Sequence, residues 1–282
     1  MIYFNYNGKT LLEATAITSP DNRGLRYGDG LFETIKYKNG QLILLDEHFA
    51  RLWKGMQLMQ FELSKIFTPD FLEQETLQLL KKNNHETARV RISVIRGNGG
   101  LYDIKNHAPN YIIQSWPLTE NHAALNENGL QLCMYNDAKK SIDSFSNLKH
   151  NNFLPYLMGA LYAKKQQCND AIIFNNLDRI ADTSIANIFL IKGETIYTPA
   201  LEEGCVAGIM RKFIIQQLII GGYIIEEAAI RKQVLLEADE LFLTNSIYNV
   251  RWVAAIDNKK YSNLHTRKIF EYLCQTNPAI FC

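Results

Sequence analysis

Hydrophobic and polar positions along the first part of this chain predict an alternation of short strands and amphipathic helices. Residues 1–8 form a strand-like opening, and the alternation over 32–40 predicts a hairpin that turns at an Asn-Gly pair. Apolar residues at helical spacing predict a helix over 48–61. A second helix is expected to begin at Thr68-Pro69, because proline suits the first turn of a helix. Two strands are then expected at 88–97 and 110–116.

The same pattern restarts after a polar stretch at 119–129, which is the best candidate for a linker. The expected strands beyond it are 129–135, 171–176, 185–200 and 241–246, and the expected helices are 153–167, 208–222 and 264–276. The sequence therefore predicts a mixed α/β fold with two domains, residues 1–118 and residues 130–282.

Composition and charge exclude several classes of protein. The chain of 282 residues is 47% apolar and 21% charged, as in ordinary soluble globular proteins, and its net charge of +1 shows no basic excess for nucleic acid. The longest apolar runs are too short to span a bilayer, so no membrane partner is expected. The five cysteines are scattered without a CxxC pair, so we expect no metal site and a reducing, cytoplasmic location.

The most informative stretch for chemistry is SNLKHNNF, in which Lys149 is flanked by serine, asparagine and histidine ahead of a predicted helix. With Lys139 and Lys140 it could simply form a solvated basic face on a binding module. A lysine that forms an imine with an aldehyde cofactor must instead be held in place and partly desolvated, so that its amine can be neutral near pH 7. Polar neighbours suit the second interpretation better.

An aldehyde cofactor such as pyridoxal phosphate needs an anion site, a carboxylate at its ring nitrogen and donors for the substrate. Several stretches offer such groups, and each has an ordinary structural explanation when taken alone: a helix arginine, a glycine before a helix, a turn before a strand, or a strand end. The candidates are Arg51 in HFARL, Gly208, Ile209 and Met210 in GCVAGIMR, Asp182 and Asn187 in DTSIANIF, Asn245 and Ser246 in TNS, and Arg96 in VIRGNGG.

The order of these pieces is more specific than any one of them. RGLRYGDGLFET, HFARL, VIRGNGG, LKHNN, ADTSIANIFLIKG, TPALEEGCVAGIMR and ADELFLTNS follow one another as in the fold-type IV pyridoxal-phosphate enzymes, and the chain resembles this class IV aminotransferase family over nearly its whole length. The family includes branched-chain aminotransferases, D-amino-acid aminotransferases and 4-amino-4-deoxychorismate lyases. The resemblance implies two α/β domains with the active site in the cleft between them, pyridoxal 5'-phosphate as cofactor, and a homodimer.

The resemblance also assigns roles to individual residues. It implies that Lys149 forms the imine with the cofactor and is the catalytic residue. The expected cofactor contacts are Arg51, Gly208, Ile209, Met210 and Ser246 near the phosphate, with Asp182, Asn187 and Asn245 completing the set. The expected substrate contacts are Tyr27, Thr34 and Arg96.

One position departs from the family pattern. The family usually has glutamate at the ring nitrogen, five residues before the asparagine, whereas this chain has Asp182. Aspartate is shorter by one methylene, or roughly 1.5 Å of reach. Whether the shorter carboxylate serves the ring nitrogen is left open by the sequence.

The motifs around Lys149 favour one activity within the family. Branched-chain aminotransferases typically carry tyrosine five residues after the lysine, where this chain has Leu154, and the KHxNxL pattern resembles the aminodeoxychorismate lyases. We therefore expect an enzyme that converts 4-amino-4-deoxychorismate to 4-aminobenzoate and pyruvate, a step of folate biosynthesis. The alternative within the family is a class IV aminotransferase, and a non-enzymatic binding module is the third hypothesis.

Overall fold

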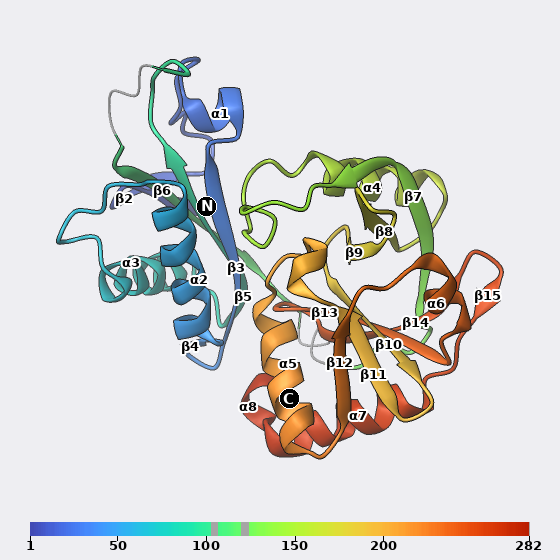
Figure 1. Cartoon of the computed structure of the whole chain (residues 1–282). Helices are drawn as coiled ribbons and strands as arrows, with labels where there is room; N and C mark the ends of the chain where they lie inside the picture. Colours follow the sequence, from blue (N-terminus) through green and yellow to red (C-terminus); the bar gives the residue numbers. More distant parts are fainter. Residues whose placement is uncertain (103–106, 120–123, 282) are drawn as a thin grey trace. The chain divides into compact units, whose positions relative to one another are not determined.

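The computed structural model describes residues 1–102, 107–119 and 124–281 (Figure 1). The chain divides into two compact units. The first comprises Met1–Glu120 together with Leu148–Asn152, and the second comprises Asn121–Asn147 and Phe153–Cys282. The expected linker at 119–129 lies partly outside the described residues, at 120–123. The domain bounds expected from the sequence stay a prediction.

The first unit is an antiparallel sheet with two helices packed on it. Its strands lie in the order β2-β1-β6-β5-β3-β4, with every neighbouring pair antiparallel. Its elements are β1 (Tyr3–Tyr6), β2 (Lys9–Leu12), α1 (Arg23–Tyr27), β3 (Gly30–Lys38), β4 (Gln41–Leu42), α2 (Leu45–Leu58), α3 (Pro69–Lys82), β5 (Thr87–Arg96) and β6 (Pro109–Pro117).

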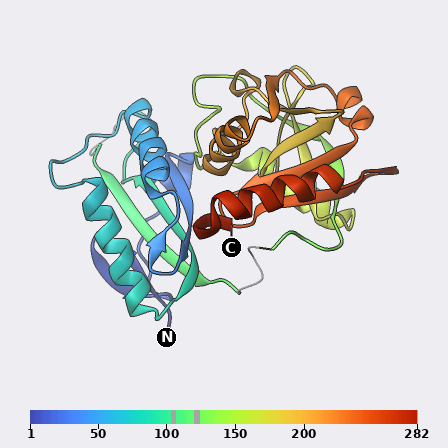
Figure 2. The same cartoon turned by 90° about the horizontal axis from the view of Figure 1, so that it is seen from below.

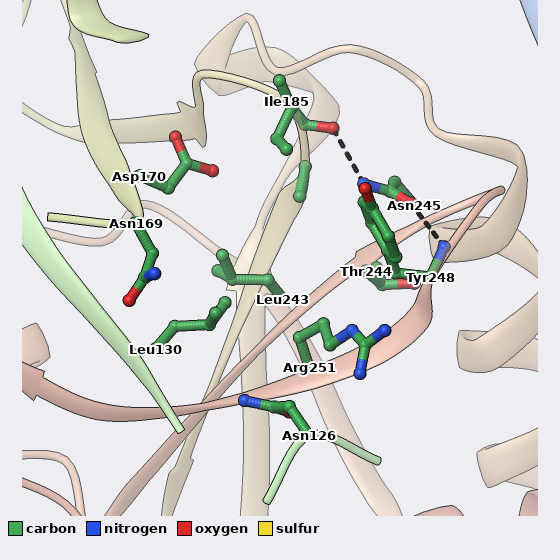
Figure 3. Close-up of a pocket in the computed structure, with 11 residues that line it drawn as sticks. Asn126, Leu130, Asn169, Asp170, Ile185, Leu243, Thr244, Asn245, Tyr248 and Arg251 are labelled. Carbon is green, nitrogen blue, oxygen red and sulfur yellow. Dashed lines mark hydrogen bonds between the residues drawn. The ribbon is translucent and has the colours of Figure 1, made fainter. Parts of the chain in front are cut away.

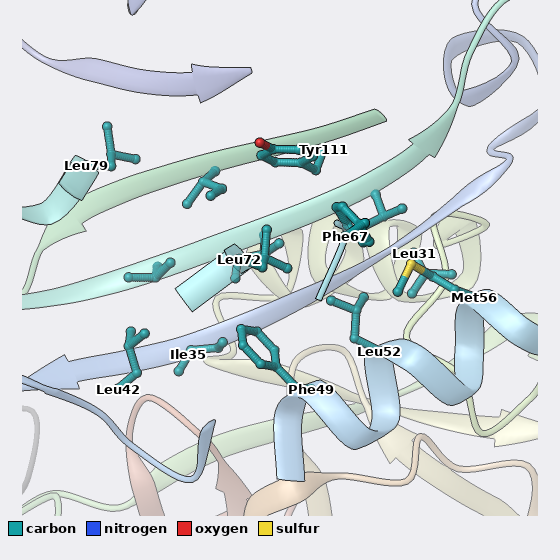
Figure 4. Packing of buried hydrophobic residues seen from close by; sticks show 14 of the residues in the cluster. Leu31, Ile35, Leu42, Phe49, Leu52, Met56, Phe67, Leu72, Leu79 and Tyr111 are labelled. Atoms are coloured by element: carbon teal, nitrogen blue, oxygen red, sulfur yellow. The ribbon is translucent and has the colours of Figure 1, made fainter. Parts of the chain in front are cut away.

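Apolar side chains from both helices and from β3, β5 and β6 form the core of this unit (Figure 4). Leu52 and Met56 of α2 and Leu72 of α3 are completely buried in it, as is Ile35 of β3. The start of α3 confirms the expected signal, because the Thr68 side chain accepts a hydrogen bond from the amide of Phe71 and proline occupies the first turn.

The second unit is built on a mixed nine-stranded sheet. The strand order is β12-β11-β10-β13-β14-β7-β8-β9, and β15 pairs with β14. Its elements are β7 (Leu130–Lys140), α4 (Leu154–Lys165), β8 (Asp170–Asn175), β9 (Ile180–Thr183), β10 (Asn187–Lys192), β11 (Thr195–Pro199), a 3-10 turn (Leu201–Glu203), α5 (Ile209–Ile220), β12 (Ile224–Ala228), α6 (Lys232–Glu237), β13 (Glu240–Asn245), β14 (Asn249–Ile256), β15 (Lys259–Lys260), α7 (Leu264–Thr276) and α8 (Pro278–Phe281).

Helices α5 and α7 both pack against β13 and against each other, and α7 runs in dark red beside the sheet in Figure 2. A buried apolar cluster of this unit is drawn from β7, β8, β9, β10, α6, β13 and β14. Within the described residues, no helix has the length and apolar character needed to span a membrane.

The predicted α/β fold is confirmed, and the differences are local. The strand expected over 185–200 is two strands, β10 and β11, because the chain turns at Gly193 with a positive φ of 59°. The helices α1, α6 and α8, and the strands β2, β9, β12, β14 and β15, were not predicted. Most of these segments are short, and the strands among them take their conformation from pairing with neighbours in the sheet more than from a pattern of their own.

Candidate active site

Lys149 lies in a loop that runs beside the first residues of β3. The amide of Phe32 donates to the carbonyl of Lys149 at 2.9 Å, and the amide of Asn151 donates to the carbonyl of Gly30 at 2.9 Å. The Lys149 side chain is half-buried, and its Nζ lies 4.7 Å from the centroid of the Phe32 ring. The loop therefore holds the lysine through main-chain bonds and partly desolvates its amine, as an imine-forming lysine requires.

Gly30 is what allows the loop to approach the strand so closely. A Cβ at this position would lie 2.5 Å from the carbonyl oxygen of Val94 and 2.7 Å from Nδ2 of Asn151. Any other residue would push the strand and the loop apart, since real Cβ atoms do not come this close to their neighbours. The glycines of RGLRYGDG and the asparagines of LKHNN thus belong to one packing arrangement, although they are far apart in the sequence.

Arg51 is held by a buried carboxylate on β3. Its Nε donates to Glu33 Oε1 at 2.8 Å and its Nη2 donates to Oε2 at 2.5 Å. His48, one turn earlier on α2, places Nδ1 2.6 Å from Glu33 Oε2. The forked geometry fixes the plane of the guanidinium group.

The charges of this cluster follow from its burial. Burial alone would raise the pKa of Glu33, but the charge of Arg51 and the hydrogen bonds from His48 and Arg51 lower it to about 2. Burial lowers the pKa of His48, against the opposing effect of Glu33. His48 is therefore neutral at pH 7 and supports Glu33 as a hydrogen-bond donor through Nδ1, while Glu33 and Arg51 form an ion pair.

Replacing Glu33 by glutamine is expected to lower the free energy of unfolding at pH 7 by about 3 kcal/mol, because it removes the carboxylate charge that pairs with Arg51 in a largely buried site. A depressed carboxyl pKa stabilises the fold above the unfolded value of 4.5, and this contribution is lost as pH falls toward 2. Urea denaturation at several pH values measures both effects. The exposed Glu13→Gln is the matched control, and equal stability of the two variants at pH 7 would contradict the assignment.

Asp182 is the centre of a buried polar cluster in the second unit. It lies on β9 with 2% of its surface exposed. Its Oδ1 accepts from Asn187 Nδ2 at 2.7 Å, and its Oδ2 accepts from the Tyr156 hydroxyl at 2.7 Å and from the Val206 amide at 2.9 Å. Burial raises the pKa of Asp182, and the charge of Lys140 and these three hydrogen bonds oppose that rise.

The start of α5 is joined to the same cluster through Asn187. The side chain of Asn187 also donates to the carbonyl of Val206 at 2.9 Å. Gly208 is the N-cap of α5 and has no capping side chain, and a Cβ there would lie 1.9 Å from Asn187 Oδ1. Only glycine fits at this N-cap, so no side chain caps the helix. The first amides of α5, those of buried Ile209 and Met210, have no acceptor within the helix. Such amides favour an anion.

Asn245 ends β13, and its side chain shapes the turn that follows. Its Oδ1 accepts from the amides of Ile247 and Tyr248 at 3.0 and 2.9 Å. Ser246 is half-buried in this turn. Asn245 also lines a cavity of about 320 Å³ within the second unit. Figure 3 shows that Leu130, Leu243 and Ile185 give this cavity much of its apolar wall, with Asp170 and Arg251 on opposite sides.

The three expected substrate residues all lie in the first unit. Tyr27, in the last turn of α1, is half-buried, and the Cζ atoms of Arg23 and Arg26 lie 5.4 and 5.1 Å from its ring centroid. Thr34 is half-buried on β3.

Arg96 is committed to contacts within its own unit. It donates to Asp29 at 3.0 Å, to the carbonyl of Gln60 at 3.1 Å and to the carbonyl of Met59, and its Nη1 lies 3.1 Å from His107 Nδ1. These are the contacts of a structural arginine, so its expected role at the substrate stays a prediction without support from its geometry.

The structure thus gathers the expected residues into two sets. Lys149 and Arg51 belong to the first unit, and Asp182, Asn187, the start of α5, Asn245 and Ser246 belong to the second. Sequence reasoning missed three partners: Glu33, His48 and Tyr156. The spacing of His48 and Arg51, three residues apart on one helix, was a usable signal that both face the same neighbour. Nothing in the sequence pointed to Tyr156.

Comparisons with known proteins agree with this arrangement. Residues 30–256 match the model of the family described as amino-transferase class IV. The chain belongs to the class IV aminotransferase family. This class IV chain is 30% identical over 271 residues to the aminodeoxychorismate lyase of Bacillus subtilis (strain 168), covering 93% of this chain and 89% of the relative. The motif resemblance is therefore confirmed at the level of the family.

Solved structures of class IV enzymes share the fold. A 4-amino-4-deoxychorismate lyase from Pseudomonas aeruginosa is 25% identical with a TM-score of 0.83, covering 97% of this chain and 99% of that one. A branched-chain aminotransferase from the archaeon Thermoproteus uzoniensis, solved with norvaline, is 22% identical with a TM-score of 0.85, covering 97% and 94%. Both kinds of enzyme in the family therefore have this architecture, and a further branched-chain aminotransferase of this fold has been solved with pyridoxamine 5'-phosphate.

Proposed function

We propose that this class IV chain is a pyridoxal-phosphate-dependent lyase that converts 4-amino-4-deoxychorismate to 4-aminobenzoate and pyruvate. The observation that carries the proposal is the likeness over 93% of the chain to an aminodeoxychorismate lyase, together with the KHxNxL pattern at Lys149. Leu154 stands where aminotransferases of branched-chain substrates typically have tyrosine, which supports the lyase over them.

The residues of each unit suit parts of pyridoxal 5'-phosphate. In the first unit, a half-buried lysine suits the aldehyde, and an arginine oriented by Glu33 suits the phosphate. In the second, the uncapped start of α5 suits a phosphate group, and a buried carboxylate suits the ring nitrogen. A side chain at position 208 would collide with Asn187. The N-cap is therefore a glycine, and the amides at the helix start have no side-chain cap.

When bound, the cofactor withdraws electrons from the substrate carbon attached to the amino group. The chain's own residues supply the rest. Arg51 and the amides of Ile209 and Met210 would hold the phosphate, Asp182 would keep a proton on the ring nitrogen, and the Lys149 amine would remove the proton from the substrate Cα. The bond between the neighbouring ring carbon and the enolpyruvyl oxygen would then break, which makes the ring aromatic. The released enolpyruvate would take up a proton and become pyruvate.

A class IV aminotransferase is the second candidate function, because two relatives that are 26% identical to this chain are named as aminotransferases of branched-chain amino acids and of D-alanine. It would use the same groups up to removal of the Cα proton and would differ in where the proton is returned. Further proposals follow from the family resemblance and the composition: a homodimer, a cytoplasmic location and a place in folate biosynthesis.

One experiment separates the candidates. The purified protein, loaded with pyridoxal 5'-phosphate, is offered enzymatically prepared 4-amino-4-deoxychorismate, and in parallel D-alanine or L-leucine with 2-oxoglutarate. We expect 4-aminobenzoate and pyruvate in equal amounts from the first mixture. Glutamate formed in either of the other mixtures, without 4-aminobenzoate in the first, would replace the lyase by an aminotransferase.

A further inference from the structure

We propose that Tyr156 is a positioning residue for Asp182. Its hydroxyl holds the aspartate carboxylate so that it can bind the ring nitrogen, at a position where the family usually has the longer glutamate. The inference rests on the proposed function in one respect: it takes Asp182 as the carboxylate at the ring nitrogen. The evidence for it lies wholly in the second unit, in the contacts among α4, β9 and the segment that precedes α5.

The first observation is the number of hydrogen bonds that each carboxylate oxygen of Asp182 accepts. An ionised carboxylate can accept about four hydrogen bonds, two at each oxygen. Oδ2 receives two, from the Tyr156 hydroxyl and the Val206 amide, and Oδ1 receives one, from Asn187. Among the residues that the structure describes, one acceptor direction is left over, on Oδ1. A ring N–H would bind there, so the Tyr156 contact at Oδ2 decides which oxygen faces the ring.

The second observation is that the Tyr156 hydroxyl has a fixed place. The side chain is 4% exposed on α4, and its ring stacks on Phe153 with centroids 4.5 Å apart and planes at 27°. The Lys140 Nζ lies 5.3 Å from the centroid of the ring. Burial and the charge of Asp182 raise the pKa of Tyr156 well above 10, so the hydroxyl keeps its proton and acts as a donor.

The third observation concerns length. The carboxylate is already in hydrogen-bond contact with the Tyr156 oxygen at 2.7 Å and with the Val206 amide at 2.9 Å. Glutamate at this position would carry its carboxylate roughly 1.5 Å further into these same groups. Tyr156 and Asp182 are therefore matched in length: the phenol fills space that a longer acidic side chain would need, and in return it holds the shorter one in place.

The pair also sets the charge of the carboxylate. Burial works against ionisation of Asp182, and the hydroxyl donor works for it. Without the hydroxyl, Asp182 would attract a proton more strongly and would support a proton on the ring nitrogen less well. A residue that only filled space would leave this protonation unchanged when its hydroxyl is removed.

The test uses Tyr156→Phe with the cofactor bound and no substrate present. The ring nitrogen of 15N-labelled pyridoxal 5'-phosphate is followed by NMR as the pH is raised. We expect the pH at which it loses its proton to fall by about one unit, a tenfold loss of proton affinity. Tyr162→Phe, on the same helix with its ring against Tyr135 at 5.4 Å, is the matched control and should leave this midpoint unchanged.

A second pair of variants tests the match in length. Asp182→Glu alone is expected to bind cofactor at least tenfold more weakly than the wild-type chain. Adding Tyr156→Phe to it should restore most of that affinity, because it removes the atom that the longer side chain meets. Asp182→Glu at wild-type affinity, or a double variant weaker than Asp182→Glu, would overturn the matched pair.

The outcomes separate this inference from the proposed function. An unchanged midpoint in Tyr156→Phe overturns the positioning role, whichever substrate the enzyme uses, because no substrate is present. A wild-type chain that does not bind pyridoxal 5'-phosphate overturns the proposed function, and the inference falls with it. A chain that binds the cofactor and shows the shifted midpoint, yet makes no 4-aminobenzoate, keeps the inference and removes only the lyase.

Discussion

Lys149→Ala is expected to fold normally and to lose turnover by more than about 10⁴-fold, because both covalent binding of the cofactor and removal of the Cα proton depend on this amine. The fold should survive, since the loop around Lys149 is held by main-chain hydrogen bonds and the lost contact with the Phe32 ring contributes only about 0.5–1 kcal/mol. Visible absorbance of the purified protein and steady-state rates measure the two losses.

Reductive trapping identifies the lysine directly. Borohydride treatment of the wild-type protein with cofactor should leave the label on the peptide that contains Lys149. The exposed Lys164→Ala should keep both colour and turnover and is the matched control. A label on Lys139, Lys140 or Lys164 would show that another amine carries the cofactor.

Asp182→Asn is expected to bind the cofactor and to lose most of its ability to exchange the substrate Cα proton, by about 10²-fold or more. The amide has nearly the shape of the carboxylate, so the contact with the amide of Val206 can be kept through its oxygen. It carries no charge, however, and so no longer favours the proton on the ring nitrogen. Exchange of the Cα proton in deuterated water, followed by NMR, measures the step without requiring the complete reaction.

A variant of the neighbouring Asn187 tests the same role of the Asp182 charge. Asn187→Asp keeps the volume of the cluster but places a second carboxylate 2.7 Å from the first, where repulsion should disturb the same step. Full exchange activity in Asp182→Asn would remove the carboxylate from the mechanism. The electrons would then be accepted without a protonated ring, or another group would hold that proton.

Much of the fold could be predicted because long periodic segments determine their own conformation. Thr68 and Pro69 mark the start of α3 as the capping signals require, and Gly208 and Gly221 bound α5 at the expected ends. Short strands such as β9 carry little pattern of their own. Ile180 and Asp182 are strand residues because β8 pairs with them, and a single sequence does not display that pairing.

The residues of the candidate site also differ in how well the sequence predicts them. Residues that act through their own chemistry, such as Lys149 and Arg51, could be found from motifs. Residues that act by holding others could not, because the partner is distant in the chain: Glu33 lies 18 residues before Arg51, and Tyr156 lies 26 before Asp182. Packing against Phe153 and burial place Tyr156 at Asp182, and no spacing rule connects them.

The loop 148–152 has a consequence for synthesis of the protein. It belongs to the first unit, yet it is encoded after the first part of the second. On the ribosome, residues 1–119 emerge before Lys149 and Asn151, whose main chains bond to the amide of Phe32 and the carbonyl of Gly30 in the folded protein. Because domains generally fold as units in order of their synthesis, the first unit of this protein cannot be completed until at least residue 152 has left the exit tunnel.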